Sequence, residues 1–201
     1  MTAARLVVAT RNASKLAELR RMLRDGLDVE LLGLNDVEPY PEVPETGATF
    51  AENALAKARE AVRHTGLPAV ADDSGLTVDA LSGMPGVLSA RWAGPGRSDQ
   101  ANLQLVLDQV ADVPDERRGA AFVCAAALVT PDGVEEVVEG RVEGTLLRAP
   151  RGENGFGYDP IFVPIGHTRT TAEMTAEEKD ALSHRGRALR VLAPRILAAL
   201  S

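Results

Sequence analysis

Short β-prone runs alternate along this chain with longer segments in which apolar residues recur every three or four positions. The first run covers residues 6–10, and a helical spacing begins at Ser14. Residues 122–130 are typical of a buried strand, which the Pro-Asp-Gly turn at 131–133 joins to a hairpin partner at 134–142. Strands mixed with helices around one hairpin predict an α/β fold with a mixed β-sheet flanked by helices.

Capping residues mark the ends of several expected helices. Thr49 with Glu52, and Thr175 with Glu178, have the spacing of a capping box, and Ser98 can cap another helix between them. The remaining expected elements are a helix from Ser14 to Gly26, a proline-rich loop at 33–48, a strand at 69–71, an irregular loop at 82–97, a glycine-rich loop at 151–157, a short strand at 161–163, and a last helix from 184 to 200 with a kink or boundary at Pro194.

Length and composition indicate a packed, soluble protein of a single domain, residues 1–201, with or without two lobes. The formal net charge of −7 argues against a nucleic acid polymer as partner. Cys124 is the only cysteine, which suits a reducing cytosol. Residues 1–5 lack signal-peptide features, and no apolar run reaches the ~20 residues that span a bilayer. We therefore expect a cytoplasmic protein without a membrane partner.

The segment Thr10-Arg11-Asn12-Ala13-Ser14-Lys15 lies between the first strand and the first helix. Exposed amides at a helix N-terminus attract anions. Lys15 falls in the first turn, where the helix dipole disfavours a cation unless a phosphate binds there. The segment predicts either a phosphate site or a simple helix cap made by Asn12 or Ser14.

Two neighbouring carboxylates, Asp72 and Asp73, are expected at the end of the 69–71 strand, followed by Ser74 and Gly75. Carboxylate oxygens suit a hard cation such as Mg²⁺, and one of the two could accept a proton from an attacking water. The alternative is a solvated turn, because Asp-Ser-Gly is common in turns.

Polar residues of the second expected helix could also contact phosphate. Asn53 and Lys57 are four positions apart and share a helix face, so an amide and an ammonium group could point to the same ligand. Glu45 lies in the loop before this helix. The alternative is that all three are solvated surface groups.

Two aromatic residues, Phe156 and Tyr158, lie in a glycine-flanked loop, although aromatic residues make up only 3% of the chain. Exposed rings stack on nucleobases, and this contributes roughly 1–3 kcal/mol per base in single strands. The alternative is that both rings fill the core.

Farther along, His184 and Arg185 could donate hydrogen bonds to a carbonyl oxygen of a purine base. Adenine carries an amino group at that position, so such a site would disfavour adenine. The alternative is that the two residues interact with a helix dipole.

The order and spacing of these segments resemble the inosine triphosphate pyrophosphatase family, which acts on non-standard purine nucleotides. The resemblance extends from Val7 to Arg185 and is specific in combination, although each motif alone is weak. Arg11 departs from the family pattern, since many relatives have glycine or a small polar residue there. The matching segments are residues 9–15, 45–47, 50–54 with Lys57, 71–76, 83–86, 89–91, 155–160 and 183–186.

The resemblance implies an elongated, two-lobed fold with an active-site cleft between the lobes, assembled as a homodimer. It implies Mg²⁺-dependent hydrolysis of ITP, dITP or XTP to the monophosphate and pyrophosphate. Asp73 would accept the proton, and Glu45 with Asp73, and Asp72 as a further candidate, would hold the metal. The substrate-binding residues that it implies are Thr10, Arg11, Asn12, Ala13, Ser14, Lys15, Lys57, Ser74, Phe156, Gly157, Tyr158, Asp159, Lys179, His184 and Arg185.

Two other functions agree with parts of the sequence. A pyrophosphatase of similar fold could act on pyrimidine or modified nucleotides. A non-catalytic nucleotide-binding module could use the same basic residues. Glu45, Asp72 and Asp73 argue against the second alternative, because a protein that only binds a triphosphate gains little from added negative charge.

Overall fold

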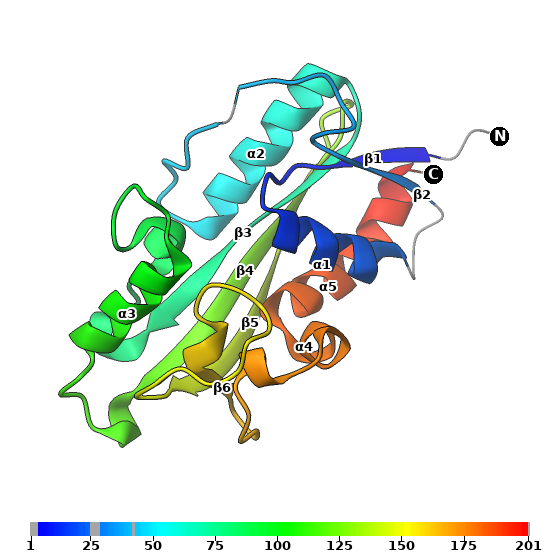
Figure 1. Cartoon of the computed structure of the whole chain (residues 1–201). Helices are drawn as coiled ribbons and strands as arrows, with labels where there is room; N and C mark the ends of the chain where they lie inside the picture. The colour runs from blue at the N-terminus through cyan, green and yellow to red at the C-terminus, as the bar shows by residue number, and fades with distance from the viewer. Residues whose placement is uncertain (1–3, 25–28, 42, 201) are drawn as a thin grey trace. The chain divides into compact units, whose positions relative to one another are not determined.

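The computed structural model describes residues 4–24, 29–41 and 43–200 of the 201-residue chain (Figure 1). Two compact units make up the chain. Unit 1 contains Met1–Asp73, Cys124–Gly140 and Arg185–Ser201, and unit 2 contains Ser74–Val123 and Arg141–His184. The single two-lobed domain expected from the sequence stays a prediction.

Strands and helices alternate through most of the chain. The strands are β1 (Ala4–Val8), β2 (Val29–Gly33), β3 (Ala69–Val78), β4 (Gly119–Val129), β5 (Glu135–Leu146) and β6 (Phe162–Pro164). The α-helices are α1 (Ala13–Arg24), α2 (Phe50–Thr65), α3 (Asp99–Gln109), α4 (Ala176–Leu182) and α5 (His184–Leu200). Short 3₁₀ helices are η1 (Asp79–Leu81), η2 (Gly86–Arg91), η3 (Asp115–Arg117), η4 (Asp159–Ile161) and η5 (Thr171–Glu173).

The strands form a mixed sheet with the order β2-β1-β3-β4-β5-β6. β1 pairs in parallel with both β2 and β3, whereas β5 and β6 are antiparallel. β3 is shared between the units, because unit 1 ends at Asp73 and unit 2 begins at Ser74. The predicted α/β class with a mixed sheet is confirmed.

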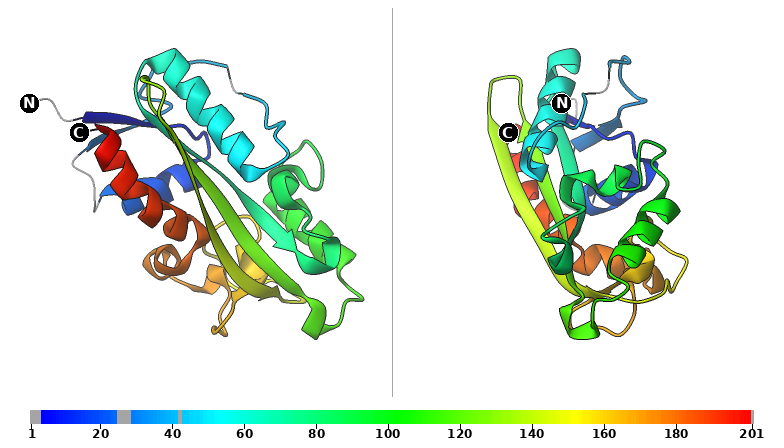
Figure 2. Two further views of the ribbon diagram at one scale, coloured as in Figure 1. Left: turned by 180° about the vertical axis from the view of Figure 1, so that it is seen from behind. Right: turned by 90° about the vertical axis from the view of Figure 1, so that its left-hand side faces the viewer.

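The core of unit 1 lies between its strands and the helices α1 and α5, which lie close together in Figures 1 and 2. Alternate residues of a strand point to the same face of the sheet, so Leu6 and Val8 of β1 reach this core together. Leu19 of α1 and Leu192 of α5 pack against them. α2 contributes a separate buried stripe made mainly of alanines, and it lies beside β3 (Figures 1 and 2).

The core of unit 2 is formed by β3, β4, β5, β6 and α3. Leu103 and Val106 of α3 pack with Leu76 of β3, and the rings of Phe122 and Phe162 are 4.5 Å apart. Aromatic residues are scarce in the chain, yet this unit buries several of them. The rest of its apolar interior is aliphatic.

The helix starts predicted from capping residues are confirmed. Thr49 accepts a hydrogen bond from the Glu52 N–H, Ser98 accepts one from Ala101, and Thr175 forms a complete capping box with Glu178. Pro194 lies inside α5. The predicted end of α1 at Gly26 lies outside the described residues.

Two expectations about strands are wrong. The sequence interpretation omitted β2, whose five residues give little period-two signal. It also ended the second strand at residue 71, whereas β3 continues through Asp72 and Asp73 to Val78. The charges do not end the strand because the buried Arg185 and the partly buried Lys15 and Lys57 compensate them.

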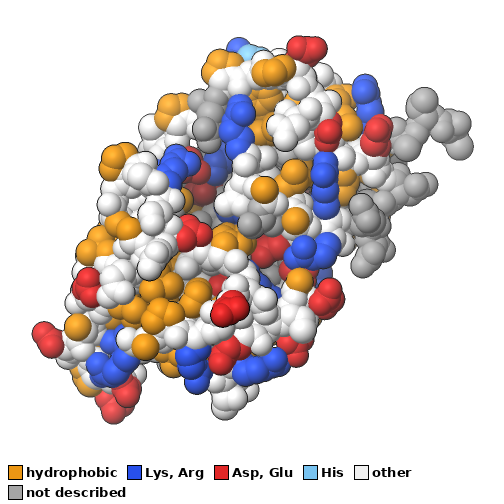
Figure 3. Space-filling view, viewed as in Figure 1, with side chains coloured by type: hydrophobic (Ala, Val, Ile, Leu, Met, Phe, Trp, Pro, Cys, Tyr) orange, Lys and Arg blue, Asp and Glu red, His pale blue; other side chains and the backbone are white. Residues whose placement is uncertain are grey.

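Acidic and basic side chains are interspersed along the lower border of the face shown in Figure 3. Exposed ion pairs in unit 2 include Arg148 with Asp115 and Arg169 with Glu178, each at 2.7 Å. Such pairs contribute little to stability. In the described part of the chain, no helix combines the length and the apolar composition needed to cross a membrane.

A substitution at Gly144 tests the packing of β5 against β6. A Cβ atom at this position would lie 2.4 Å from the Val163 carbonyl oxygen and 2.6 Å from Phe162 Cζ. Overpacking predicts that Gly144→Ala lowers the free energy of unfolding by about 1–3 kcal/mol in urea denaturation. Gly96→Ala is the control, because no atom lies within 4 Å of its added Cβ. Equal stability of the two variants would contradict the packing.

Candidate active site

The first β–α connection carries the predicted phosphate segment. Asn12 Oδ1 accepts a hydrogen bond from the Lys15 N–H at 3.1 Å, so Asn12 caps α1. The Asn12 N–H in turn donates to Thr10 Oγ1 at 3.2 Å. Asn12 and Ala13 are exposed at the helix start, and the Ser14 side chain lies outside what the structure describes. The cap uses only one of the first amides, so it leaves others for an anion, and the predicted phosphate site stays a prediction.

A group of four charges, which we call the Asp72 cluster, is buried in unit 1. Asp72 Oδ2 is 3.2 Å from both Lys15 Nζ and Arg185 Nε, and the other end of the Arg185 guanidinium contacts the Glu18 carboxylate. The side chains of Asp72 and Arg185 are almost fully buried. Burial alone would raise the pKa of Asp72, but Lys15 and Arg185 hold it well below its usual range. Two cations and two carboxylates thus form a neutral group that is largely buried.

A second group in unit 1, the Asp73 cluster, lies on the next residue of β3. Lys57 Nζ contacts Glu45 Oε1 at 2.5 Å and Asp73 Oδ1 at 3.1 Å. The Asn53 side-chain amide donates to Asp73 Oδ2 at 2.9 Å, and Asn53 Oδ1 accepts from the Gly47 N–H. Burial raises the pKa of Asp73, against the opposing effect of Lys57. Burial lowers the pKa of Lys57, but Asp73 and Glu45 raise it more, so Lys57 remains charged.

The two neighbouring aspartates have separate partners because successive residues of a strand point to opposite faces of the sheet. Asp72 shares a face with Val70, which packs in the core with α1 and α5, and its carboxylate meets Lys15 and Arg185 from those helices. Asp73 points to the other face, where α2 provides Lys57. The continuation of β3 through both residues is therefore what separates the two carboxylates.

The donor set of the Asp73 cluster fits one divalent cation. Among the described residues, no group of three or more His, Cys, Asp or Glu side chains is placed to hold a metal ion. Glu45 and Asp73 nevertheless both contact the same ammonium group of Lys57, so two carboxylates converge on one cationic position. Mg²⁺ commonly uses one or two carboxylates together with water and substrate phosphates. That Glu45, Asp73 or Asp72 ligates a metal stays a prediction.

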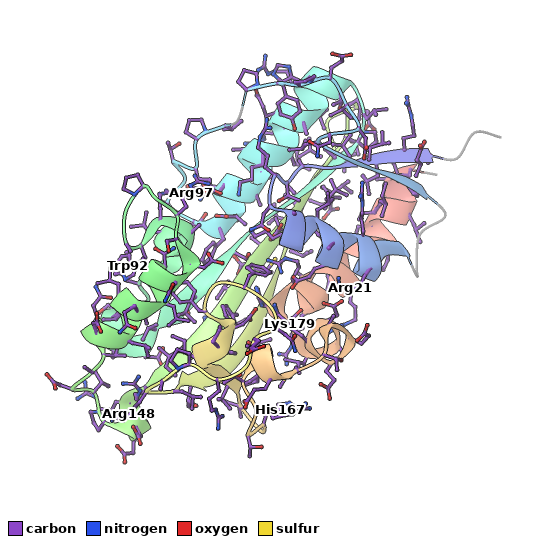
Figure 4. The ribbon with its side chains drawn as sticks, in the orientation of Figure 1. Arg21, Trp92, Arg97, Arg148, His167 and Lys179 are labelled. Atoms are coloured by element: carbon purple, nitrogen blue, oxygen red, sulfur yellow. The ribbon has the colours of Figure 1, made fainter. Side chains whose placement is uncertain are left out.

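Unit 2 holds a third group, the Phe156 cluster, around the glycine-rich loop. Lys179 Nζ is 2.7 Å from Asp159 Oδ2 and 4.7 Å from the centre of the Phe156 ring. Lys179, labelled in Figure 4, comes from α4 and lies beside the loop that carries Phe156. Asp159 Oδ2 also accepts the Phe156 N–H at 2.8 Å, and its Oδ1 accepts the Thr171 hydroxyl. The half-buried Phe156 ring is thus held against a paired ammonium group.

Gly155 allows the loop to approach the Asp159 carboxylate. Its φ of 76° lies in the left-handed region, and a Cβ atom there would be 2.1 Å from Asp159 Oδ2. The next glycine, Gly157, also has a left-handed φ of 62°, and its N–H donates to Asp99 Oδ2 at 2.9 Å. The loop conformation therefore depends on both glycines.

The other predicted residues of unit 2 are more enclosed. Tyr158 is buried in the core and donates its hydroxyl to the Ser89 carbonyl oxygen at 2.8 Å, as the core-filling alternative predicted. The imidazole of His184 stacks on Phe122 with ring centres 5.0 Å apart. Ser74 is half-buried on β3. Direct substrate contacts by Ser74, Tyr158 and His184 stay predictions.

The structure brings Lys15, Asp72 and Arg185 together in the first cluster, Glu45, Lys57 and Asp73 in the second, and Phe156, Asp159 and Lys179 in the third. Of the described side chains, it places those of Thr10 to Ala13, Ser74, Tyr158 and His184 in none of the three. Sequence interpretation missed Glu18, although its spacing of three from Lys15 on α1 was a usable signal. It also missed Asp99 and Thr171, which hold the Phe156 loop from a helix start and a 3₁₀ helix. No local pattern distinguishes these two residues from ordinary helix-capping residues.

The fold and these clusters define an α/β protein with lysine–carboxylate groups at its first β–α connection and on a central strand. The chain belongs to the Ham1 family, whose sequence profile matches residues 6–195. The resemblance stated from sequence motifs is therefore confirmed.

Individual relatives agree over nearly the whole chain. A Mycobacteroides abscessus protein named dITP/XTP pyrophosphatase is 65% identical over 192 residues, covering 94% of this chain and 93% of that protein. A Nocardia farcinica protein of the same name is 64% identical over 200 residues, covering 98% and 97%. The solved structure of a Ham1 protein from Coxiella burnetii has a TM-score of 0.87 at 45% identity, covering 97% of this chain and 99% of that one.

Removing the Asp72 charge tests whether the buried cluster stabilises the protein. In Asp72→Asn, Lys15 and Arg185 lose a fully buried counter-charge, so we expect a loss of about 3 kcal/mol or more in the free energy of unfolding. Asp36→Asn is the matched control, because its pair with Arg20 is exposed and contributes about 1 kcal/mol or less. If urea denaturation showed losses of similar size for Asp72→Asn and Asp36→Asn, the expected difference between the buried and the exposed ion pairs would be contradicted.

Proposed function

We propose that this protein hydrolyses non-standard purine nucleoside triphosphates, such as ITP, dITP and XTP, to the monophosphate and pyrophosphate. The observation that supports this most is the placement of Lys15, Lys57, Glu45, Asp72 and Asp73 in two adjoining charge clusters of unit 1. Relatives of over 60% identity along nearly the full chain carry the name dITP/XTP pyrophosphatase. Removal of non-standard nucleotides from the cellular pool follows from that activity.

The two aspartates have different roles in this proposal. Asp72 remains ionised between Lys15 and Arg185 and positions Lys15 beside the start of α1. The start of α1, formed by Thr10, Asn12, Ala13 and Ser14, then offers its amides to the triphosphate next to a lysine, while Arg11 donates to the Tyr40 carbonyl oxygen. Lys15 and Lys57 neutralise negative charge that develops on the departing pyrophosphate.

Asp73 accepts the proton of the water that attacks the α-phosphorus. Its carboxylate is held by Asn53 and Lys57, and its burial disfavours the charged form, which makes it a better base than an exposed aspartate. Mg²⁺, bound by Glu45 and Asp73, would supply charge neutralisation for the phosphate oxygens and lower the pKa of water. Displacement of Lys57 from the two carboxylates towards phosphate would make room for the ion.

The Phe156 cluster of unit 2 binds the nucleobase in this proposal. The ring of Phe156 stacks on the base, and Gly157, Asp159 and Lys179 fix its loop or meet the edge of the base. His184 supplies a donor that favours a carbonyl oxygen over the amino group of adenine, whereas the Arg185 guanidinium is buried between Asp72 and Glu18. A pyrimidine-specific enzyme is the second candidate only because the same ring could stack on a pyrimidine.

The cytoplasmic location and the homodimer are also proposals. They rest on the single cysteine and on the family resemblance.

Replacement of the proposed base should separate chemistry from folding. Asp73→Asn retains the shape of the side chain but cannot accept the proton, so we expect pyrophosphate release to fall on the order of a hundredfold or more. Circular dichroism should show a folded protein. Asp108→Asn, on the exposed side of α3, is the control and should keep full activity. Undiminished activity of Asp73→Asn would remove Asp73 as the base.

A panel of nucleoside triphosphates tests the proposed specificity. Because donors should face the purine carbonyl, kcat/KM for ITP and XTP should exceed that for ATP on the order of a hundredfold or more. Pyrimidine triphosphates serve as the comparison for the second candidate. Pyrophosphate should be the released product, and release of single phosphate groups or no release would reject the proposed reaction.

A further inference from the structure

The loop between β2 and α2 lies along α2 and is attached to it at several points. We call residues 34–41 and 43–49 the β2–α2 loop. The Tyr40 ring stacks on the His64 imidazole with centres 4.8 Å apart and planes 5° from parallel. Glu45 contacts Lys57, and the Gly47 N–H donates to Asn53 Oδ1. Loop residues with higher numbers contact helix residues with lower numbers, so the loop runs antiparallel to α2.

These attachments place Glu45 between two fixed points. Tyr40 is held near the C-terminal end of α2, and Gly47 is held near its N-terminal end. Lys57 lies about two helical turns before His64, and Glu45, which contacts Lys57, follows Tyr40, which contacts His64. The position of the Glu45 carboxylate therefore depends on both ends of this stretch of loop.

Arg11 holds the first of the two fixed points from outside α2. Its guanidinium Nη2 donates to the Tyr40 carbonyl oxygen at 2.7 Å. The contact joins the connection between β1 and α1 to the β2–α2 loop, and it involves the same residue whose ring stacks on His64. Tyr40 is thus fixed through its backbone by one partner and through its side chain by another.

We propose that Arg11 is a positioning residue that holds the β2–α2 loop, and with it Glu45, in place for the divalent cation. The proposal rests on the proposed function for the role of Glu45. It assigns Arg11 a backbone contact in the protein, in place of the direct phosphate contact that the family resemblance implied. An arginine suits this role because its planar guanidinium is always charged and forms a charge-assisted hydrogen bond with the carbonyl.

Amide exchange measured by NMR tests the positioning without any substrate or metal. The N–H groups of Gly47 and Ala48 report on the loop because they donate to Asn53 Oδ1 at 2.8 Å and to Glu52 Oε2 at 2.7 Å. In Arg11→Gln, we expect both amides to exchange about five- to tenfold faster, as loss of one such hydrogen bond predicts. Arg11→Lys should restore part of the protection.

Matched variants separate the contact from a general loss of stability. Arg59→Gln removes an exposed ion pair with Glu135 from the same helix and should leave the exchange of both amides unchanged. Tyr40→Phe keeps an aromatic ring on His64 and should behave like the wild type, whereas Tyr40→Ala should accelerate exchange as Arg11→Gln does. Unchanged exchange in Arg11→Gln would overturn the proposal.

The response to Mg²⁺ gives a second readout. Arg11→Gln should raise the Mg²⁺ concentration for half-maximal activity about five- to tenfold, while KM for ITP at saturating Mg²⁺ stays near the wild-type value. A raised KM with unchanged Mg²⁺ response and unchanged amide exchange would instead identify Arg11 as a phosphate ligand. If the wild type released no pyrophosphate, the proposed function would fail, and the exchange measurement would still decide the role of Arg11.

Discussion

The buried carboxylate of Asp72 is the constraint on which unit 1 depends. A charge on the interior of a strand is tolerated only when other buried charges compensate it. Lys15 of α1 and Arg185 of α5 compensate the charge of Asp72, and Glu18 in turn balances the charge of Arg185. The ionised aspartate is therefore compatible with the fold only when both helices lie against β3, which couples a charge in the candidate site to the packing of the core.

The Asp72 cluster and the Asp73 cluster differ in their balance of charges. The Asp72 cluster contains equal numbers of cations and carboxylates, whereas Lys57 faces both Glu45 and Asp73. In the proposed function, the two carboxylates that meet Lys57 bind a divalent cation together with the substrate phosphates. Opposite faces of a single strand keep these environments separate, although their aspartates are neighbours in sequence.

The local features of the fold could be predicted from the sequence, and its long-range compensations could not. Thr49, Ser98 and Thr175 were identified as helix caps because capping uses residues within one turn. The extension of β3 through Asp72 and Asp73 was missed because the compensating Lys15 and Arg185 are remote in sequence. The candidate site residues were identified by motif and resemblance, but the separate partners of the two aspartates became clear only from the strand geometry.

The scarcity of aromatic residues has a practical consequence for studies of folding. Trp92 is the only tryptophan of the chain, and it belongs to unit 2. Its indole N–H donates to Gln109 Oε1 at 2.8 Å, and its ring packs against the apolar core of that unit (Figure 4). Intrinsic tryptophan fluorescence therefore reports on unit 2 alone, whereas far-ultraviolet circular dichroism reports on both units. Comparing the two signals during denaturation distinguishes a single cooperative transition from stepwise melting without introducing any label.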